Sequence, residues 1–248
     1  MDGIFIKVTV FISVMCGRIF SEHDKRLVLH SSEDLLNVIS KLERKVESLD
    51  AEVTALKAKQ LTCGATYIRW GKTACPMNGT ELIYKGYMAG DKWDEYGGGS
   101  NNLCLPEDPT WNQYVDGYNS GAVIYGTEIE ADSAVSNKLF GKPTDNQDIP
   151  CAVCRSSRAS HLMLPARTNC YPGWTGEYDG YLVSGHPAWK TNSDYICLDS
   201  GLEFVPHGSA NDNEHVLMPV EVRCGLLGSL PCPPFVDGRE LACVFCTK

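Results

Sequence analysis

Apolar residues recur every seven positions along residues 31–62, at two sites in each heptad. Leucine fills one site and a β-branched residue the other, in the series Leu35, Ile39, Leu42, Val46, Leu49, Val53 and Leu56. The segment has no glycine or proline, and Ser31 with Asp34 resembles a weak capping box at its start. The pattern predicts an α-helix with the narrow apolar stripe that is typical of a coiled coil.

Charges beside the stripe favour parallel chains in register. Lys45 of one helix would face Asp50 of its partner, and Glu52 would face Lys57. β-Branched residues alternating with leucine favour a homodimer, and a homotrimer also fits. The alternative is an amphipathic helix packed on its own domain, although such a face is usually wider than this one.

From Gly64 onward the heptads stop, and short β-prone runs alternate with turn residues. The expected strands are Thr66–Trp70, Glu81–Tyr87, Ala122–Glu130, Tyr181–Ser184, Tyr195–Leu198 and His215–Arg223. No long periodic helix is apparent, so we expect an all-β head. Three acidic loops, Asp91–Asn102, Asp132–Asp148 and Gly208–Glu214, lack regular calcium-ligand spacing and are expected to be solvated.

The head contains one cysteine pattern twice. Cys75, Gly86-Tyr87, Cys104, Cys151 and Cys154 are repeated in order as Cys170, Gly180-Tyr181, Cys197, Cys243 and Cys246. The offset drifts only from 95 to 92 residues, which indicates duplication. The fold class expected is therefore mainly β: a helical coiled coil (31–62) and then a disulfide-rich head of two similar tandem subdomains, 63–157 and 158–248.

Composition and the N-terminus indicate an extracellular protein. Twelve cysteines and 23 glycines are typical of a disulfide-stapled, turn-rich chain. Residues 1–17 are apolar and short and are expected to be a secretory signal peptide, with a buried strand or a membrane anchor as the alternatives. Residues 18–30 are expected to be a linker. A formal charge of −9 argues against nucleic acid or an acidic membrane as partner.

Cys63 falls at the next leucine-type position after the heptads. In parallel helices such positions face each other, so Cys63 is a candidate for an interchain disulfide; a disulfide within the head is nearly as well supported. If Cys16 is removed with the signal peptide, eleven cysteines remain. One of them must then be free or bonded to another chain.

The cysteine-bearing segments resemble the C-terminal non-collagenous domain of type IV collagen, which is also two tandem copies. Tyr67-Ile-Arg-Trp-Gly71, Cys75-Pro-Met-Asn-Gly79 and Cys104-Leu-Pro-Glu-Asp-Pro-Thr-Trp111 look still more like the invertebrate short-chain (spongin-type) collagens. The resemblance spans residues 63–248 and is closer in the first copy. The Gly-X-Y repeats of that family are absent here, and the heptads stand in their place.

The resemblance implies a disulfide pairing. The first and last cysteines of a copy join, and the second and third join: Cys75–Cys154, Cys104–Cys151, Cys170–Cys246 and Cys197–Cys243. Cys224 and Cys232 would then close a small loop, and Cys63 would be left over. The sequence by itself permits many other connectivities.

Catalysis has no positive support, because no Ser-His-Asp order, His-Glu-x-x-His or phosphate loop is present, and no cofactor is implied. The two Cys-x-x-Cys pairs fit structural disulfides better than redox or zinc sites. Asn78 lies in the single Asn-x-Ser/Thr sequon and is a candidate glycosylation site. The tryptophans fit buried anchors better than a sugar-binding surface, and Trp93 is expected to be the most exposed.

We therefore expect a secreted, non-enzymatic protein of the extracellular matrix or of a secreted coating. Its expected partner is itself, as a homodimer or homotrimer joined by the coiled coil and further through the heads, and matrix proteins or glycans are the other partners expected. The alternative is a multivalent recognition protein, lectin-like or immune, whose several heads bind surface glycans with avidity.

Overall fold

A computed structural model describes residues 32–62, 64–225 and 228–248. The expected signal peptide, the linker and Cys63 lie outside these ranges. Contacts between Cα atoms divide the chain into two units, Met1–Lys59 and Gln60–Lys248. Each unit is described by itself below.

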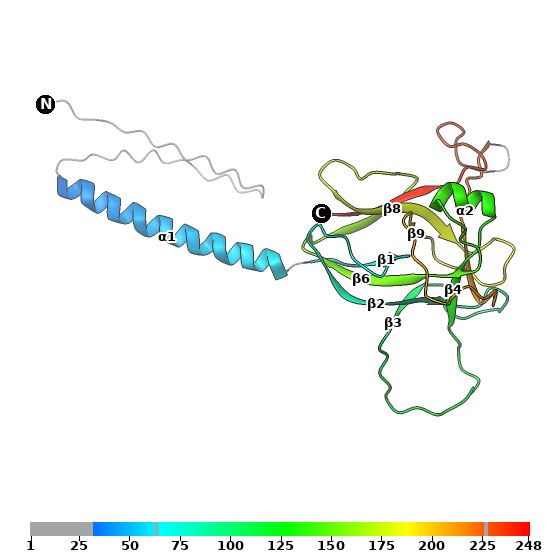
Figure 1. The fold of residues 1–248 in the computed structure, drawn as a ribbon. Helices are drawn as coiled ribbons and strands as arrows, with labels where there is room; N and C mark the ends of the chain where they lie inside the picture. The colour runs from blue at the N-terminus through cyan, green and yellow to red at the C-terminus, as the bar shows by residue number, and fades with distance from the viewer. Residues whose placement is uncertain (1–31, 63, 226–227) are drawn as a thin grey trace. The chain divides into compact units, whose positions relative to one another are not determined.

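Helix α1, Ser32–Thr62, confirms the expected helix, and all but its last three residues belong to the first unit (Figure 1). Glu33 and Asp34 lie in its first turn, where negative charge stabilises a helix N-terminus. The seven residues of the apolar stripe are each between 45 and 58 % exposed. An uncovered stripe leaves the helix without the packing that normally stabilises one.

The second unit, the head, is mainly β and contains a second helix, α2 (Ser133–Phe140). Its strands are β1 (Thr66–Trp70), β2 (Thr80–Gly90), β3 (Leu103–Pro106), β4 (Tyr125–Ile129), β5 (Gln147–Asp148), β6 (Pro150–Ser156), β7 (His161–Pro165), β8 (Thr175–Ser184), β9 (Ile196–Asp199), β10 (His215–Pro219) and β11 (Ala242–Thr247).

Strand pairing closes a ring in the head. The order β10-β4-β2-β6-β1-β9-β8 returns to its start because β8 also pairs with β10. Strands β11 and β7 continue from β8, β3 pairs with β2, and β5 pairs with β4. All of these pairings are antiparallel except β1 with β9 and β4 with β10, which are parallel and join residues before 157 to residues after it.

The same antiparallel pairings occur on both sides of residue 157. Strand β2 pairs with β3, β4 and β6, and β8 pairs with β9, β10 and β11. Strand β1 pairs with β6 as β7 pairs with β11. We call residues 64–157 the first half and residues 158–248 the second half. The two halves share one sheet and form one compact unit rather than two separate ones.

Five disulfides staple the head, as the cysteine content led us to expect. They join Cys75 to Cys154, Cys104 to Cys151, Cys170 to Cys246, Cys197 to Cys243 and Cys224 to Cys232. These are the pairs that the resemblance implies. The two long-range pairs of each half span similar lengths of chain, 79 and 47 residues in the first and 76 and 46 in the second.

Helix α2 corrects the expectation that the head is all β. Asp132 caps it by accepting a hydrogen bond from the N–H of Ala134 (2.8 Å), and Gly141 ends it with a φ of 70°. Phe140 is buried, and its ring meets that of Tyr181 edge-on at 5.4 Å. Eight residues with two buried side chains, Ser136 and Phe140, are too few to show a helical period in the sequence.

Several expected strands have different bounds. Strand β4 begins at Tyr125 rather than Ala122, and β10 ends at Pro219 rather than Arg223. Proline has no N–H to continue a ladder, which accounts for the second difference. The acidic loops are also less solvated than expected, because Asp91, Asn102 and Thr144 are buried.

Candidate interaction surfaces

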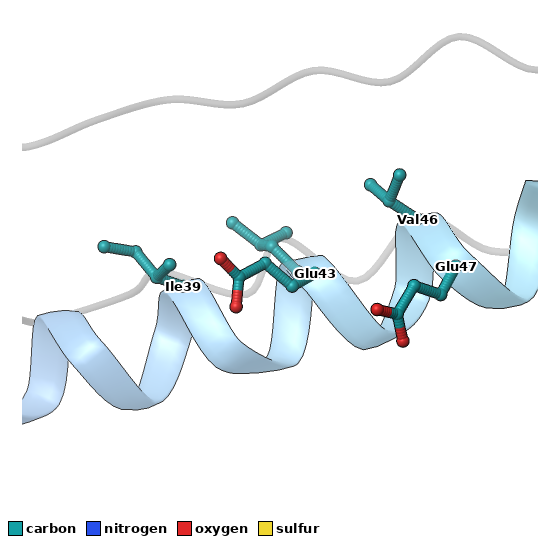
Figure 2. Close-up of a pocket in the computed structure, with 5 residues that line it drawn as sticks. Ile39, Glu43, Val46 and Glu47 are labelled. Carbon is teal, nitrogen blue, oxygen red and sulfur yellow. The ribbon is translucent and has the colours of Figure 1, made fainter.

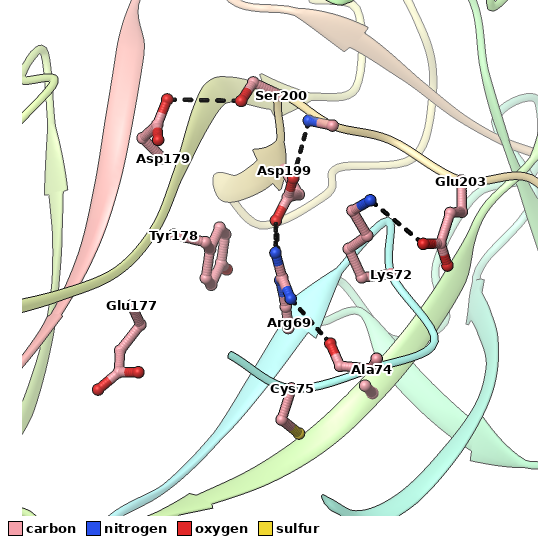
Figure 3. A network of polar contacts seen from close by, with 12 residues as sticks. Arg69, Lys72, Ala74, Cys75, Glu177, Tyr178, Asp179, Asp199, Ser200 and Glu203 are labelled. Atoms are coloured by element: carbon pink, nitrogen blue, oxygen red, sulfur yellow. Dashed lines mark hydrogen bonds and ion pairs between the residues drawn. The ribbon is translucent and has the colours of Figure 1, made fainter. Parts of the chain in front are cut away.

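A polar cluster joins the two halves where β1 runs parallel to β9 (Figure 3). Arg69 of β1 forms an ion pair with Asp199 of β9 at 2.7 Å, and both side chains are mostly buried. The Arg69 guanidinium also donates to the carbonyl of Ala74 (2.9 Å) and lies over the ring of Tyr178. Burial and the nearby Asp199 carboxylate raise the pKa of Tyr178, so its hydroxyl stays protonated and donates to the Cys197 carbonyl.

The turn after β1 extends this contact. Glu203 accepts hydrogen bonds from the N–H and hydroxyl of Thr73 (3.0 and 2.8 Å) and pairs with Lys72 (3.2 Å). Its own N–H donates to the carbonyl of Gly71 (2.7 Å). These partners lower the pKa of Glu203 although partial burial opposes the shift. The segment after β9 is therefore clamped onto the turn after β1.

A second polar cluster is built around Glu177 of β8, whose side chain is fully buried. It pairs with Arg158 at 2.5 Å and accepts hydrogen bonds from the hydroxyls of Tyr67 (3.2 Å) and Thr247. Burial and the Glu177 carboxylate raise the pKa of Tyr67. Because Tyr67 comes from β1 and Thr247 from β11, this cluster also ties the first half to the second.

His215 occupies the other junction of the halves, where β10 pairs with β4. Its Nδ1 lies 2.8 Å from the Thr127 hydroxyl and its Nε2 3.2 Å from the Ser193 hydroxyl, which in turn donates to Asn102. Burial lowers the pKa of His215 to about 4. The Ser193–His215 contact is the geometry of a nucleophile and its base, but Thr127 rather than a carboxylate orients the ring. We interpret it as a structural hydrogen-bond chain.

The apolar stripe of α1 is the first candidate interaction surface. Ile39, Leu42 and Val46 line an open groove along the helix, with Glu43 and Glu47 at its edge (Figure 2). The side chains of Ile39 and Val46 project from the same side of the helix.

The second candidate surface is the outer face of β2 and β3, which we call the first-half face. Tyr87 and Leu105 lie directly opposite each other across the two strands and are 45 and 37 % exposed, and Leu103 is 41 % exposed. Their equivalents in the second half are Tyr181, Leu198 and Ile196 by strand register. Leu198 is fully buried and Ile196 is 8 % exposed.

A long aromatic loop continues from the first-half face. It connects β3 to β4 through residues 107–124 and extends away from the sheet in Figure 1. Trp111, Tyr114 and Tyr118 are 78, 71 and 96 % exposed. This corrects the expectation for Trp93, which is half-buried with its ring 5.8 Å from that of Trp189. Trp111 lies seven residues after Cys104, as Phe204 lies seven after Cys197, and Phe204 packs against the core, so the sequence carried no signal for the exposure of Trp111.

Asn78 is exposed, as a glycosylation acceptor must be, and its amide donates to the carbonyl of Gly176 (3.1 Å). In the described ranges no three His, Cys, Asp or Glu side chains gather closely enough to hold a metal ion. Among the described helices, none is long and apolar enough to cross a membrane. No family model matches the chain.

Proposed function

We propose that this is a secreted, non-enzymatic structural protein that assembles with copies of itself through a coiled coil and through its heads. The observation that carries the proposal is the apolar stripe of α1, seven residues that are each between 45 and 58 % exposed. The occupant that fits the stripe is a second α1 in parallel register, because Lys45 would then meet Asp50 and Glu52 would meet Lys57.

The pairings repeated in the two halves support the head as a tandem duplication of one unit. The resemblance to the short-chain collagens and to the type IV collagen domain supports a role in the extracellular matrix or a secreted coating. Five disulfides favour an oxidising, extracellular compartment.

Leu105 and Leu103 of the first half are exposed, whereas the equivalent residues of the second half are buried. This difference supports a contact between heads that would cover the exposed pair. Within one chain, Leu198 and Ile196 of the second half lie in one buried cluster with Trp70 of β1 and with Leu202 of the segment after β9. The equivalent partner for Leu105 and Leu103 would be β7 with its following turn, residues 166–168. In the described residues β3 and β7 each have one unpaired edge.

A second copy can supply this missing contact. Arg167 has the place of Lys72, and Ala166 has the left-handed backbone that Gly71 also has (φ 60° and 87°). Glu107 and Asp108 lie at the edge of the first-half face and would approach Arg167 of the next chain. Such a contact joins two different surfaces, so it continues from chain to chain as a ring or an open array.

Sedimentation velocity of the full chain tests the stalk. We expect the wild type to sediment as an oligomer. The double variant Leu42→Ser with Leu49→Ser should sediment as a smaller species, because its helices no longer associate. Leu36→Ser is the control, since Leu36 is 66 % exposed but lies outside the stripe. A monomeric wild type at micromolar concentration would contradict self-assembly.

The head contact has its own test. Leu105→Asp should weaken association beyond the stalk oligomer, while Leu230→Asp, at a leucine of similar exposure (43 % against 37 %), should not. If both variants associate as the wild type does, the heads do not meet through the first-half face.

The exposed aromatic loop favours a second candidate function, recognition of surface glycans. Trp111, Tyr114 and Tyr118 offer ring faces on which sugars stack. Residues 107–124 contain no lysine or arginine, so the loop is unsuited to polyanions. Glycan-array binding by the purified oligomer, competed by free sugar and lost in Trp111→Ala, would favour this function over a purely structural one.

A further inference from the structure

Two carboxylates face each other beside the junction of β4 with β10. Glu128 of β4 lies directly opposite Asp148 of β5 in the antiparallel register. Glu128 is 3 % exposed; its Oε1 accepts a hydrogen bond from the N–H of Asp212 (3.2 Å), and its Oε2 has no hydrogen-bond partner. Like charges directly opposite on a sheet are destabilising, and a buried carboxylate without a partner is more so.

The other charges around Glu128 are mostly negative. Glu130 follows on β4 and Asp212 comes from the segment before β10, while Val216 of β10 is apolar. None of the ion pairs found in the described residues includes Glu128, Asp148 or Asp212. Burial first and neighbouring carboxylates second raise the pKa of both Glu128 and Asp148.

The chain closes tightly over this cluster. The N–H of Asp148 donates to the carbonyl of Gly208 (3.0 Å), and a Cβ added at Gly208 would lie 2.3 Å from Asp148 Oδ2. Only glycine therefore fits at position 208 without displacing the carboxylate. In the described residues no ion pair brings a lysine or arginine to either carboxylate, so a bound proton is the simplest group that can neutralise the buried Glu128.

We propose that Glu128 and Asp148 form a proton-holding latch on the junction of the two halves, closed in acidic solution and loosened as the pH rises. The latch acts on the halves because β4–β10 is one of the two parallel pairings that join them. It does not depend on self-assembly and concerns the head of each chain. A carboxyl that binds its proton more tightly when folded adds stability at low pH and loses it as pH rises.

Urea unfolding of the full chain between about pH 3.5, below the ordinary pKa of a glutamate carboxyl, and about pH 7 tests the latch, at one chain concentration and one ionic strength. The unfolding constant of the wild type is divided by that of Glu128→Gln at each pH. We expect this ratio to rise several-fold over the range and then to level off, since the variant cannot lose the proton. A ratio that stays flat would overturn the proposal.

Further variants keep the test decisive. Asp148→Asn should give the same trend, and Asp116→Asn, at an exposed carboxylate of the aromatic loop, should give none. His215 lies on β10 beside the same junction and responds to pH in the opposite direction. Its contribution is common to the wild type and the carboxylate variants and cancels in the ratio.

Hydrogen exchange locates the effect and separates a proton from a metal. The amides of Val216 and Leu217 should exchange faster at the higher pH, after correction for intrinsic rates, in the wild type but not in Glu128→Gln. Excess calcium at neutral pH should leave the unfolding constant unchanged. If calcium restores the stability seen in acid, the cluster is a cation site and the proton latch is wrong.

Discussion

The glycine of each Gly-Tyr pair is required by the close approach of a neighbouring strand. A Cβ added at Gly86 would lie 1.7 Å from the carbonyl oxygen of Leu105, and one added at Gly180 would lie 1.7 Å from that of Leu198. The repeated motif therefore marks the place where the backbones of β3 and β9 come closest to their antiparallel partners β2 and β8. No side chain larger than hydrogen fits there.

Gly180→Ala should lower the free energy of unfolding by about 3 kcal/mol, because backbone atoms must move to admit the methyl group. Gly121→Ala is the control, since nothing lies within 4 Å of a Cβ added there. Chemical denaturation of both variants measures the difference. Equal stabilities would mean that β9 can shift at little cost.

His215 should make the head less stable in acid. Burial lowers its pKa from 6.5 to about 4, so the folded head prefers the neutral ring. The stability that this preference contributes is fully present above pH 6.5 and is lost as pH falls from 6.5 through about 4. His215→Gln should reduce this acid-dependent loss, measured as the melting temperature against pH. His186→Gln, at an exposed ring, should leave it unchanged.

At the scale of elements, equivalent strands of the two halves differ in what covers them. Strands β3 and β9 follow the same Gly-Tyr strand and carry the same Cys-Leu pair, yet Leu105 is 37 % exposed and Leu198 is buried. Local sequence predicts both strands but not this difference, because the cover on β9 comes from β1, more than a hundred residues earlier. Helix α2 was not predicted for a related reason. Its buried Phe140 packs against Tyr181, which is distant in sequence, and the local sequence offers little more than the cap at Asp132.

The disulfides should contribute unequally. Replacing Cys75 and Cys154 with serine opens a loop of 79 residues, and replacing Cys224 and Cys232 opens one of 8. Loop entropy alone gives losses of about 4.5 and about 2.5 kcal/mol. Denaturation of the two double variants should show the first as the less stable. The reverse order would mean that native-state contacts of the second pair outweigh chain entropy.

At the scale of the whole molecule, the two halves are joined by buried polar contacts as well as by strand pairing. Arg69–Asp199 is the most enclosed of the charged contacts between β1 and β9, with side-chain exposures of 17 and 6 %. Breaking one partner of such a pair leaves a charge that water cannot reach. The head should therefore unfold as one cooperative unit rather than half by half.

Arg69→Ala should cost about 3 kcal/mol in the free energy of unfolding because Asp199 is left buried and unpaired. Arg223→Ala is the control: its pair with Asp237 is exposed at 68 and 49 %, and its loss should cost about 0.5 kcal/mol or less. Urea denaturation followed by both fluorescence and circular dichroism measures the cost and the cooperativity. Two separate transitions in the wild type would contradict a single unit.

The sequence by itself determined the features that repeat locally. Heptad spacing identified α1, alternation with turn residues identified many of the strands, and the cysteine and Gly-Tyr spacing predicted a repeated order of elements in the head. Such patterns can be recognised in the sequence because each residue type is selected by neighbours within one helical turn or one strand. The resemblance, rather than spacing, supplied the cysteine pairs.

The tertiary structure alone decided which residues form the contacts between the two halves and which side chains stay exposed to solvent. The Arg69–Asp199 pair, the buried His215 and the opposed Glu128 and Asp148 bring together residues up to 130 positions apart. Exposure is decided in the same way, which is why Trp111 and not Trp93 lies at the surface. Burial and electrostatic fields depend on the assembled surroundings of a residue, and no local pattern records those surroundings.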